Sequence, residues 1–377
     1  MAASVIPAAS YGVLAPYLIE SLEISRARLG LLTTGYMIVG ATLSVYSGSL
    51  VDHHGPERVI RWLNISVLIG VGFMVLFGSY WGLLVGALIG GFANAAANPA
   101  TNSMVAIHLS ARGRGLAIGV KQSGIQFSYF VFGGLPLIAT AVGWRAALAT
   151  TAILPLISLA AFSTRRTSSD LLTTKGPYSP SGRARIPAGV WWLTAYAFSL
   201  GLATAAVSSY LVLYAVEGLN ISRALAGLAA TVMGGLGLIA RVAAGRIAER
   251  LNHASGFLAI LAGMAAISSL LLLIAPNLEI GWFWLATVLA GVSLGAWNAV
   301  ASLAVISEVD ARFAGRASGV LLTGFLVGLT FSPVLFGWSV DRTGNYDMGW
   351  FSVAIAAVCS LFLALAWRRS TFRNRDS

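Results

Sequence analysis

Long apolar segments, separated by short polar ones, recur along the whole chain. Each segment is close to the roughly 20 residues that a helix needs to cross a bilayer. In lipid, backbone groups are satisfied only in helices or closed barrels, and barrel strands are only about ten residues long. The segments therefore predict an all-α membrane protein with twelve transmembrane helices, at residues 2–20, 29–51, 59–80, 82–107, 115–140, 144–163, 189–215, 224–247, 255–275, 281–306, 313–338 and 347–367.

Charged residues are scarce in this chain. They make up 10% of its 377 residues, whereas 57% of the residues are apolar. Soluble domains carry about 25% charged residues, so this composition could not cover a water-exposed surface. The first segment lacks the basic residues that begin a signal peptide, so we expect a retained helix. Cys359 is the single cysteine, which excludes a disulfide within the chain.

Basic residues are concentrated on one side of the predicted bundle. If both termini are cytoplasmic, the inner loops and tail carry 17 Lys or Arg residues and the outer loops carry 5. Positive residues are enriched on the cytoplasmic side of membranes, so we expect a multi-pass plasma-membrane protein, of the bacterial inner-membrane type, with both termini inside. Anionic lipid at that face accounts for the net charge of +11 without a nucleic-acid partner.

The two halves of the sequence repeat each other. The pattern Leu-x-Ile-Ser-Arg-Ala at 22–27 recurs 197 residues later, and GVKQSG at 119–124 matches GVLLTG at 319–324. Parallel repeats of this kind build transporter folds, whose substrate site lies near the midplane between the halves. A stretch rich in Ser, Thr, Pro and Arg is typical of a linker. The predicted parts are an N-terminal six-helix half at 1–163, a cytoplasmic linker at 164–188, a C-terminal six-helix half at 189–367 and a cytoplasmic basic tail at 368–377.

The polar turn after the second segment carries a family motif. The stretch GSLVDHHGPER at 48–58 resembles the signature Gly-x-Leu-x-Asp-Arg-x-Gly-Arg-Arg of the major facilitator superfamily, and GRIAER at 245–250 is a weaker copy. The resemblance implies the major facilitator fold, a monomer, and a cytoplasmic gate that these motifs hold shut. The predicted gate residues are Gly48, Asp52, Gly55, Arg58, Gly245, Glu249 and Arg250.

Three asparagines lie four residues apart in the fourth segment. Asn94, Asn98 and Asn102 therefore share one helical face. Amides are costly against lipid, so this face should meet either a water-filled cavity or another helix, and both possibilities remain open. Asn298, with Trp297 beside it, is the repeat partner of Asn98 and favours the cavity. In the family that the chain resembles, the first, fourth, seventh and tenth helices line the central path.

Of the 24 basic residues, Lys121 and Arg241 are the two that remain when those assigned to the inner and outer loops and the tail are set aside, and both fall within predicted spans. Lys121 lies roughly 9 Å along its helix from the cytoplasmic end, so its amine could either reach back to the interface or face a cavity. By its place in the eighth segment, Arg241 resembles the arginine that pairs with substrate in oxalate, monocarboxylate and nitrate porters. The alternative for Arg241 is a salt bridge at the cytoplasmic gate.

No acidic residue is predicted at mid-bilayer. The 13 carboxylates fall at span ends, in loops or in the tail. Two cavity cations without an acid favour a negatively charged ligand, which would supply the missing countercharge. We therefore expect a secondary transporter that moves a small anionic solute, an organic carboxylate, by alternating access, with no cofactor and no metal. The predicted substrate-binding residues are Lys121, Arg241, Asn94, Asn98, Gln122, Gln126, Trp297 and Asn298.

The alternative is a proton-coupled exporter of drugs or hydrophobic compounds. Exporters of that kind in this superfamily usually carry Gly-Pro-x-x-Gly-Gly in the fifth helix, whereas GGLPLIATAVG at 133–143 lacks the glycine pair after Pro136. A sensor on the same fold would be expected to carry a large soluble output domain. An enzyme is not expected, because the sequence has no metal-spaced His or Cys set, phosphate loop or nucleophile motif.

Overall fold

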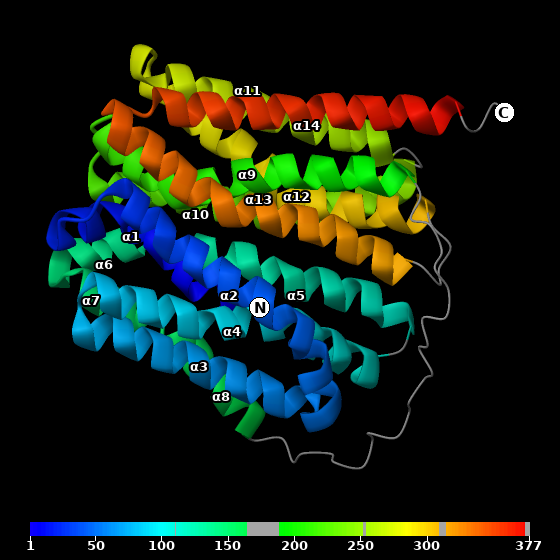
Figure 1. The fold of residues 1–377 in the computed structure, drawn as a ribbon, viewed down its shortest axis with the longest axis horizontal. Helices are drawn as coiled ribbons and strands as arrows, with labels where there is room; N and C mark the ends of the chain where they lie inside the picture. The colour runs from blue at the N-terminus through cyan, green and yellow to red at the C-terminus, as the bar shows by residue number, and fades with distance from the viewer. Residues whose placement is uncertain (110, 164–187, 252–253, 309–313, 374–377) are drawn as a thin grey trace.

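The computed structural model is built from helices (Figure 1) and describes all residues except 110, 164–187, 252–253, 309–313 and 374–377. The first half contains η1 (Ala3–Val5), α1 (Ile6–Leu22), α2 (Arg26–His54), α3 (Pro56–Phe77), α4 (Tyr80–His108), α5 (Ala111–Phe132), α6 (Leu135–Val142), α7 (Trp144–Thr150) and α8 (Ile153–Ser163). The second half contains α9 (Ala188–Glu217), α10 (Arg223–Leu251), α11 (Ala254–Ile274), η3 (Ala275–Asn277), α12 (Ile280–Glu308), α13 (Ala314–Thr343) and α14 (Asp347–Arg373).

Two layers of helices make up the molecule, and each layer is one half of the chain. In Figure 1, α9 to α14 form the upper layer and α1 to α8 the lower layer. The described residues contain eleven helical stretches that are long and apolar enough to span a membrane, and twelve when the bent pair 26–44 and 46–54 counts as one span. The predicted all-α membrane fold is therefore confirmed. The predicted linker 164–188 lies outside the described residues, except for Ala188, which begins α9.

The fifth predicted span is a broken helix. Gly133 and Gly134 separate α5 from α6, and Pro136 lies in the first turn of α6. Proline lacks a backbone N–H and is tolerated at a helix start, whereas in a continuous helix it would disrupt the preceding turn. The two pieces still make one crossing, Gly119–Val142.

The sixth span lies where it is predicted but is also a broken helix, and the last helix is longer than its predicted span. The sixth span consists of α7 and α8, which together make the crossing Trp144–Phe162. The last helix continues to Arg373, so the predicted tail 368–377 begins inside α14. The helix extends into this basic stretch because a helix does not need apolar side chains in order to form. Only the part that crosses the lipid must be apolar.

Ion pairs between the two halves close one end of the bundle. Arg26 at the start of α2 lies 2.9 Å from Glu217 of α9 and 3.7 Å from Asp341 of α13. Arg223 of α10 pairs with Glu20 of α1. We call this end, with its five charged residues, the sealed end. The distribution of basic residues predicts that it faces away from the cytoplasm.

Asp341 also caps α2. Its two carboxylate oxygens accept hydrogen bonds from the backbone N–H groups of Arg26, at 3.0 Å, and Ala27, at 2.8 Å. The first turn of a helix has unpaired N–H groups and a partial positive charge, so a carboxylate there is stabilising. Nearby, Tyr346 donates to Glu217, and burial together with this carboxylate raises the pKa of Tyr346. The phenol therefore keeps its proton, and it completes the sealed end as a hydrogen-bond donor.

From the sealed end, the halves meet along two seams of different chemistry. Between α2 and α13, the Thr34 hydroxyl donates to the Thr330 carbonyl at 2.7 Å. Between α5–α6 and α10, backbones approach directly: a Cβ on Gly133 would lie 2.7 Å from the carbonyl oxygen of Gly227. The first seam has close backbone packing too, since a Cβ on Gly30 would lie 2.4 Å from the carbonyl oxygen of Pro333. Both seams are therefore closely packed, and the first adds a side-chain hydrogen bond.

Within the second half, α10 and α12 also pack through glycines. A Cβ on Gly295 would lie 2.4 Å from the Cα of Gly237. The carbonyl of Gly295 accepts a hydrogen bond from Arg241 of α10. Close packing of α12 on α10 therefore fixes the position of this guanidinium.

We expect Asp341→Asn to open the sealed end, because it removes the charge that both Arg26 and the α2 N-terminus face. An exposed ion pair and a helix-end charge contribute about 0.3–1 kcal/mol each. The open population should therefore rise roughly three- to thirtyfold. Double electron–electron resonance between spin labels at Ser21 and Asn220, in a Cys359→Ala background, measures this population.

The matched control is Asp347→Asn, because Asp347 is a nearby acid that forms no ion pair with any described residue. It should leave the distance distribution as in the parent protein. If Asp341→Asn also leaves the distribution unchanged, Asp341 does not hold the sealed end closed.

We expect Gly295→Ala to destabilise the protein, because the added methyl group would meet the backbone of α10 and push the two helices apart. Overpacking of this kind costs about 1–3 kcal/mol. Thermal unfolding of the detergent-solubilised protein measures the loss. Gly281→Ala on the same helix is the control, since nothing lies within 4 Å of a Cβ there. Equal unfolding midpoints for the two variants would show that the α10–α12 contact tolerates a side chain.

Candidate functional site

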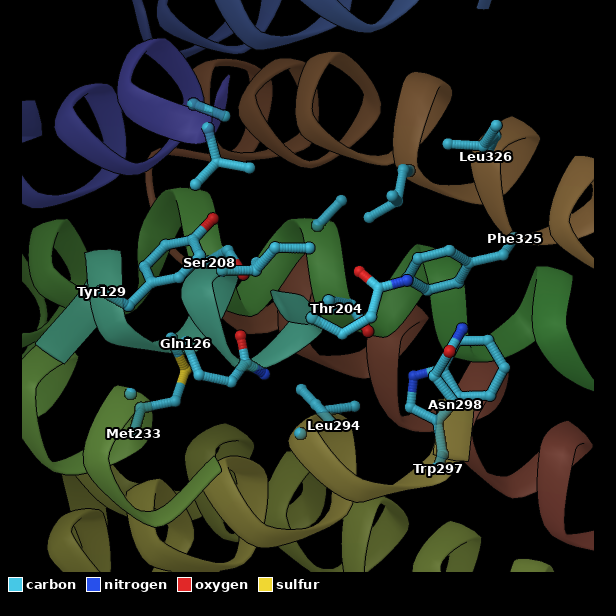
Figure 2. A pocket seen from close by; sticks show the side chains of 18 of the residues that line it. Gln126, Tyr129, Thr204, Ser208, Met233, Leu294, Trp297, Asn298, Phe325 and Leu326 are labelled. Atoms are coloured by element: carbon cyan, nitrogen blue, oxygen red, sulfur yellow. The ribbon is translucent and has the colours of Figure 1, made fainter. Parts of the chain in front are cut away.

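A cavity of about 190 Å³ lies between the two halves (Figure 2). The family resemblance implied lining by the first, fourth, seventh and tenth spans, which are α1, α4, α9 and α12. These four helices do line it, and α2, α5, α10 and α13 line it as well. The lining hydroxyl, amide and charged side chains are Thr33, Asn94, Asn98, Gln122, Gln126, Tyr129, Thr204, Ser208, Ser209, Arg241 and Asn298.

Arg241 is the one charged side chain among the described residues that line the cavity. Its Nε donates to the Gly295 carbonyl at 2.9 Å, and its Nη1 donates to the Gln122 carbonyl of α5 at 3.0 Å. These bonds use two of the five N–H groups of a guanidinium. Both partners are backbone oxygens, one from each half of the chain. The charge is therefore held in place by dipoles and is not neutralised.

Lys121 borders the cavity but does not line it. Its ammonium lies against α4, where it donates to Asn98 Oδ1 at 3.1 Å, to Thr101 Oγ1 at 3.2 Å and to Asn102 Oδ1. An ammonium has three N–H groups, so all three have partners. The partners are neutral oxygens, which solvate the charge without cancelling it.

Asn98 connects the surroundings of the two cations. Its Oδ1 accepts from Lys121 and also from Gln122 Nε2, at 3.3 Å. The backbone oxygen of Gln122 in turn accepts from Arg241. A continuous polar network therefore runs from α4 through α5 to α10.

The other predicted site residues all line the cavity. Asn94 lies on the same face of α4 as Asn98. Gln126 and Asn298 lie on opposite sides of the cavity in Figure 2. Trp297 is only 1% exposed and packs against Phe325, with ring centroids 4.7 Å apart. The cavity thus contains seven of the eight predicted residues, and Lys121 adjoins it.

The charge around this cavity is positive. No described acidic side chain lines it, and the three ion pairs of the described residues lie at the sealed end. The described residues also contain no group of three His, Cys, Asp or Glu side chains that could hold a metal ion. An anion entering the cavity would therefore meet Arg241 without competition from a protein carboxylate.

Sequence reasoning missed several lining residues. Thr204 and Ser208 of α9 lie four residues apart and face the cavity, as Figure 2 shows. Their spacing was a usable signal, but hydroxyl residues also bond to their own helix backbone, as Thr204 does to Leu200 at 2.7 Å. Phe325 of α13 lies in an apolar run, and nothing in its sequence environment distinguishes a cavity-facing side chain from a lipid-facing one.

The predicted gate motif forms the turn between α2 and α3. Gly55 joins the two helices with φ of 79°, a conformation that favours glycine. Asp52 and Arg58 flank this turn with exposed side chains, and neither forms an ion pair with another described residue. A Cβ on Gly48 would meet open space. The gate role of these residues stays a prediction.

The second copy of the motif lies at the end of α10. Gly245, Glu249 and Arg250 belong to its last turns. The side chains of Glu249 and Arg250, and the surroundings of Gly245, lie outside the described part of the structure. Their gate role is likewise a prediction.

The fold is shared with solved transporters. A bacterial homologue of the human lysosomal transporter Spinster, in an inward-facing unoccupied conformation, superposes with a TM-score of 0.71 at 16% identity, covering 97% of this chain and 93% of that one. A point mutant of the nucleoside transporter NupG gives a TM-score of 0.75 at 13% identity, covering 97% and 98% of the two chains. At these identities, the likeness concerns the fold alone.

Two sequence relatives cover nearly the whole chain. A protein named as a probable sulfoacetate transporter, SauU of Cupriavidus necator, is 25% identical over 93% of this chain and 88% of its own length. The nitrite extrusion protein of Bacillus subtilis is 22% identical over 94% of this chain and 90% of its own. The model of the Major Facilitator Superfamily matches residues 1–333. The chain therefore belongs to the Major Facilitator Superfamily, and it is a membrane transporter.

Proposed function

We propose that this transporter carries a small organic anion through the cavity between its halves. The observation that carries the proposal is Arg241, whose guanidinium faces the cavity and whose hydrogen bonds to described residues go to backbone carbonyls. A hydrogen bond between an ionised donor and an ionised acceptor is about twice as strong as a neutral one, and arginine can hold a carboxylate through two parallel bonds. An anionic substrate would supply the countercharge that the protein lacks at this point.

Lys121 would act on such a substrate at a distance, through the electrostatic field of its ammonium group. Its N–H groups are all occupied, but its charge is not cancelled, and Asn98 lies both in its coordination shell and on the cavity wall. Positive charge in a low-dielectric cleft raises the local concentration of anions. Lys121 would therefore favour entry of the anion, while Arg241 would bind it.

The named substrates of the two relatives support an anionic substrate. One relative is named for sulfoacetate and the other for nitrite, and both of these are anions. The two named substrates differ in structure and share a negative charge. The relatives therefore support an anionic substrate, whereas its organic part must be inferred from the cavity.

Alternating access requires that the two ends of the cavity open in turn. The sealed end carries ion pairs between the halves, and at the other end the predicted gate residues Asp52 and Glu249 would close the path in the opposite state. We propose that this gate end faces the cytoplasm of a bacterial inner membrane, with both termini on that side, and that the monomer is the working unit.

A hydrophobic compound is the second candidate substrate, and one observation favours it. The four residues that α13 contributes to the cavity are all apolar: Leu322, Phe325, Leu326 and Leu329. Export of an uncharged compound would not need Arg241, so the substitution below separates the two candidates.

We expect Arg241→Gln to lower anion transport at least about tenfold, because hydrogen bonds to charged groups contribute roughly 1.5–3 kcal/mol. Uptake of labelled carboxylates, sulfonates and nitrite into proteoliposomes measures the change. Arg246→Gln is the matched control, since Arg246 is an exposed arginine on the same helix and does not line the cavity. Lys121→Gln should have a smaller effect, mainly on KM.

Two results would contradict the proposal. One is anion uptake by Arg241→Gln at the rate of the parent protein. The other is uptake of a hydrophobic dye by the parent protein while none of the anions is carried.

A further inference from the structure

The walls of the cavity at the two seams have opposite polarity. The polar side chains that α5 and α10 contribute to the cavity are Gln122, Gln126, Tyr129 and Arg241, which we call the basic wall; Ile125 and Met233 lie between them. From α13 it is lined by the four apolar residues named above, which we call the apolar wall. Figure 2 shows Gln126 at one side of the cavity and Phe325 with Leu326 at the other. A ligand that fills the cavity therefore meets the one charged side chain of the described lining at the basic wall, whereas α13 offers it only hydrocarbon.

The basic wall offers binding groups for one anionic group. Arg241 has three N–H groups that bond to no described residue, because two of its five are used. Lys121 has no N–H group left to donate. The amide of Gln122 is turned toward Asn98, which it meets at 3.3 Å. Only the guanidinium can therefore pair directly with a negatively charged group in the arrangement observed.

Aromatic packing holds the apolar wall in place. Phe325 packs on Trp297, at 4.7 Å between centroids, and Trp297 packs in turn on Tyr196, at 6.2 Å. Trp297 and Tyr196 are each only 1% exposed, so this packing leaves Phe325 little freedom to rotate out of the cavity. Facing it across the first seam, α2 contributes Thr33 and Met37, and Thr33 is 5% exposed. The polar side chain beside this wall is the neutral amide of Asn298, which Figure 2 shows next to Phe325, and no described charged side chain lines the cavity there.

We infer that the substrate is an amphipathic monoanion, with one carboxylate or sulfonate group at Arg241 and an apolar tail against the apolar wall. The inference rests on the proposed function and narrows the class of anion that the cavity would bind. A second charged group on the tail would lose its water and would find no cationic partner among the described lining residues, and burial of a charge without a countercharge is strongly unfavourable. A small inorganic anion would leave the apolar wall unused and would gain nothing from it.

The size of the cavity limits the tail. Its volume is about 190 Å³, whereas pockets for drug-sized ligands occupy about 300–1,000 Å³. A short aliphatic tail fits this space. We therefore expect affinity to rise with tail length over a few methylene groups and then to stop rising.

The test is a ligand series on the purified full-length protein. Thermal unfolding is followed through the fluorescence of its 11 tryptophans, since a ligand that binds the folded state raises Tm. The probes are propionate, butyrate, pentanoate and hexanoate, with succinate and sulfoacetate as dianions and nitrite as an inorganic anion. Hexanamide, which has the tail of hexanoate without its charge, controls for partitioning into detergent.

The expected result is an affinity that rises up to about fourfold per methylene from propionate to pentanoate. Succinate, sulfoacetate, nitrite and hexanamide should each bind at least about tenfold more weakly than pentanoate. Phe325→Ala should flatten the series, whereas Phe331→Ala should not, because Phe331 is 53% exposed on the same helix and does not line the cavity. The series in the unsubstituted protein decides the question even if Phe325→Ala does not fold.

Two different failures can be told apart. If anions stabilise the protein in a manner that depends on Arg241, but the dianions or nitrite bind as well as pentanoate, the monoanion inference is wrong and the proposed function stands. If no anion stabilises the protein, or if Arg241→Gln binds anions as the parent does, the proposed function fails and the inference fails with it.

Discussion

The site depends on keeping one guanidinium charged inside a mostly apolar bundle. Burial of a charge is costly unless hydrogen bonds compensate it, and pairing with an acid would cancel the charge itself. Arg241 avoids both outcomes by donating to two backbone oxygens, one on α12 and one on α5. Those oxygens are well placed because α10 packs closely on both neighbouring helices through glycines. The close helix packing and the electrostatics of the site therefore have a common origin.

The two seams share close backbone packing and differ in their polar contacts. Contacts between glycine backbones in the second seam, at Gly133 and Gly227, leave little freedom for separation. The first seam is joined by a threonine hydrogen bond and, at the sealed end, by the carboxylate of Asp341. Hydrogen bonds and ion pairs of this kind can exchange with water at small net cost, whereas close packing cannot. The first seam also contains close packing, at Gly30 against Pro333 and at Gly337 against Arg26, so its opening requires these backbones to separate as well.

The sequence was sufficient to predict the fold and the amide and charged side chains that line the cavity, because both depend on signals that are rare in a chain of this composition. Apolar segments of span length and a repeated motif predict the helices, and polar residues at lipid depth, such as Asn98 and Arg241, predict the cavity. Apolar lining residues such as Phe325 could not be predicted, since lipid and cavity select the same side chains. The orientation of Lys121 toward α4 was also beyond the sequence, because it depends on which neighbouring helix offers three oxygens at the right distances. The breaks in the fifth and sixth spans depend on local packing in the same way.

The coordination of Lys121 has a consequence for how this transporter could diverge. Asn98 and Asn102 supply two of its three oxygens, and each differs from aspartate only by an amide in place of a carboxylate oxygen. An exchange at either position would preserve the shape of the network and the contact to the amine, yet it would erase the positive field beside the cavity. The charge that the substrate must carry is thus set independently of the helix arrangement. Descendants of this chain could acquire neutral or cationic substrates through isosteric changes that leave the helices in place.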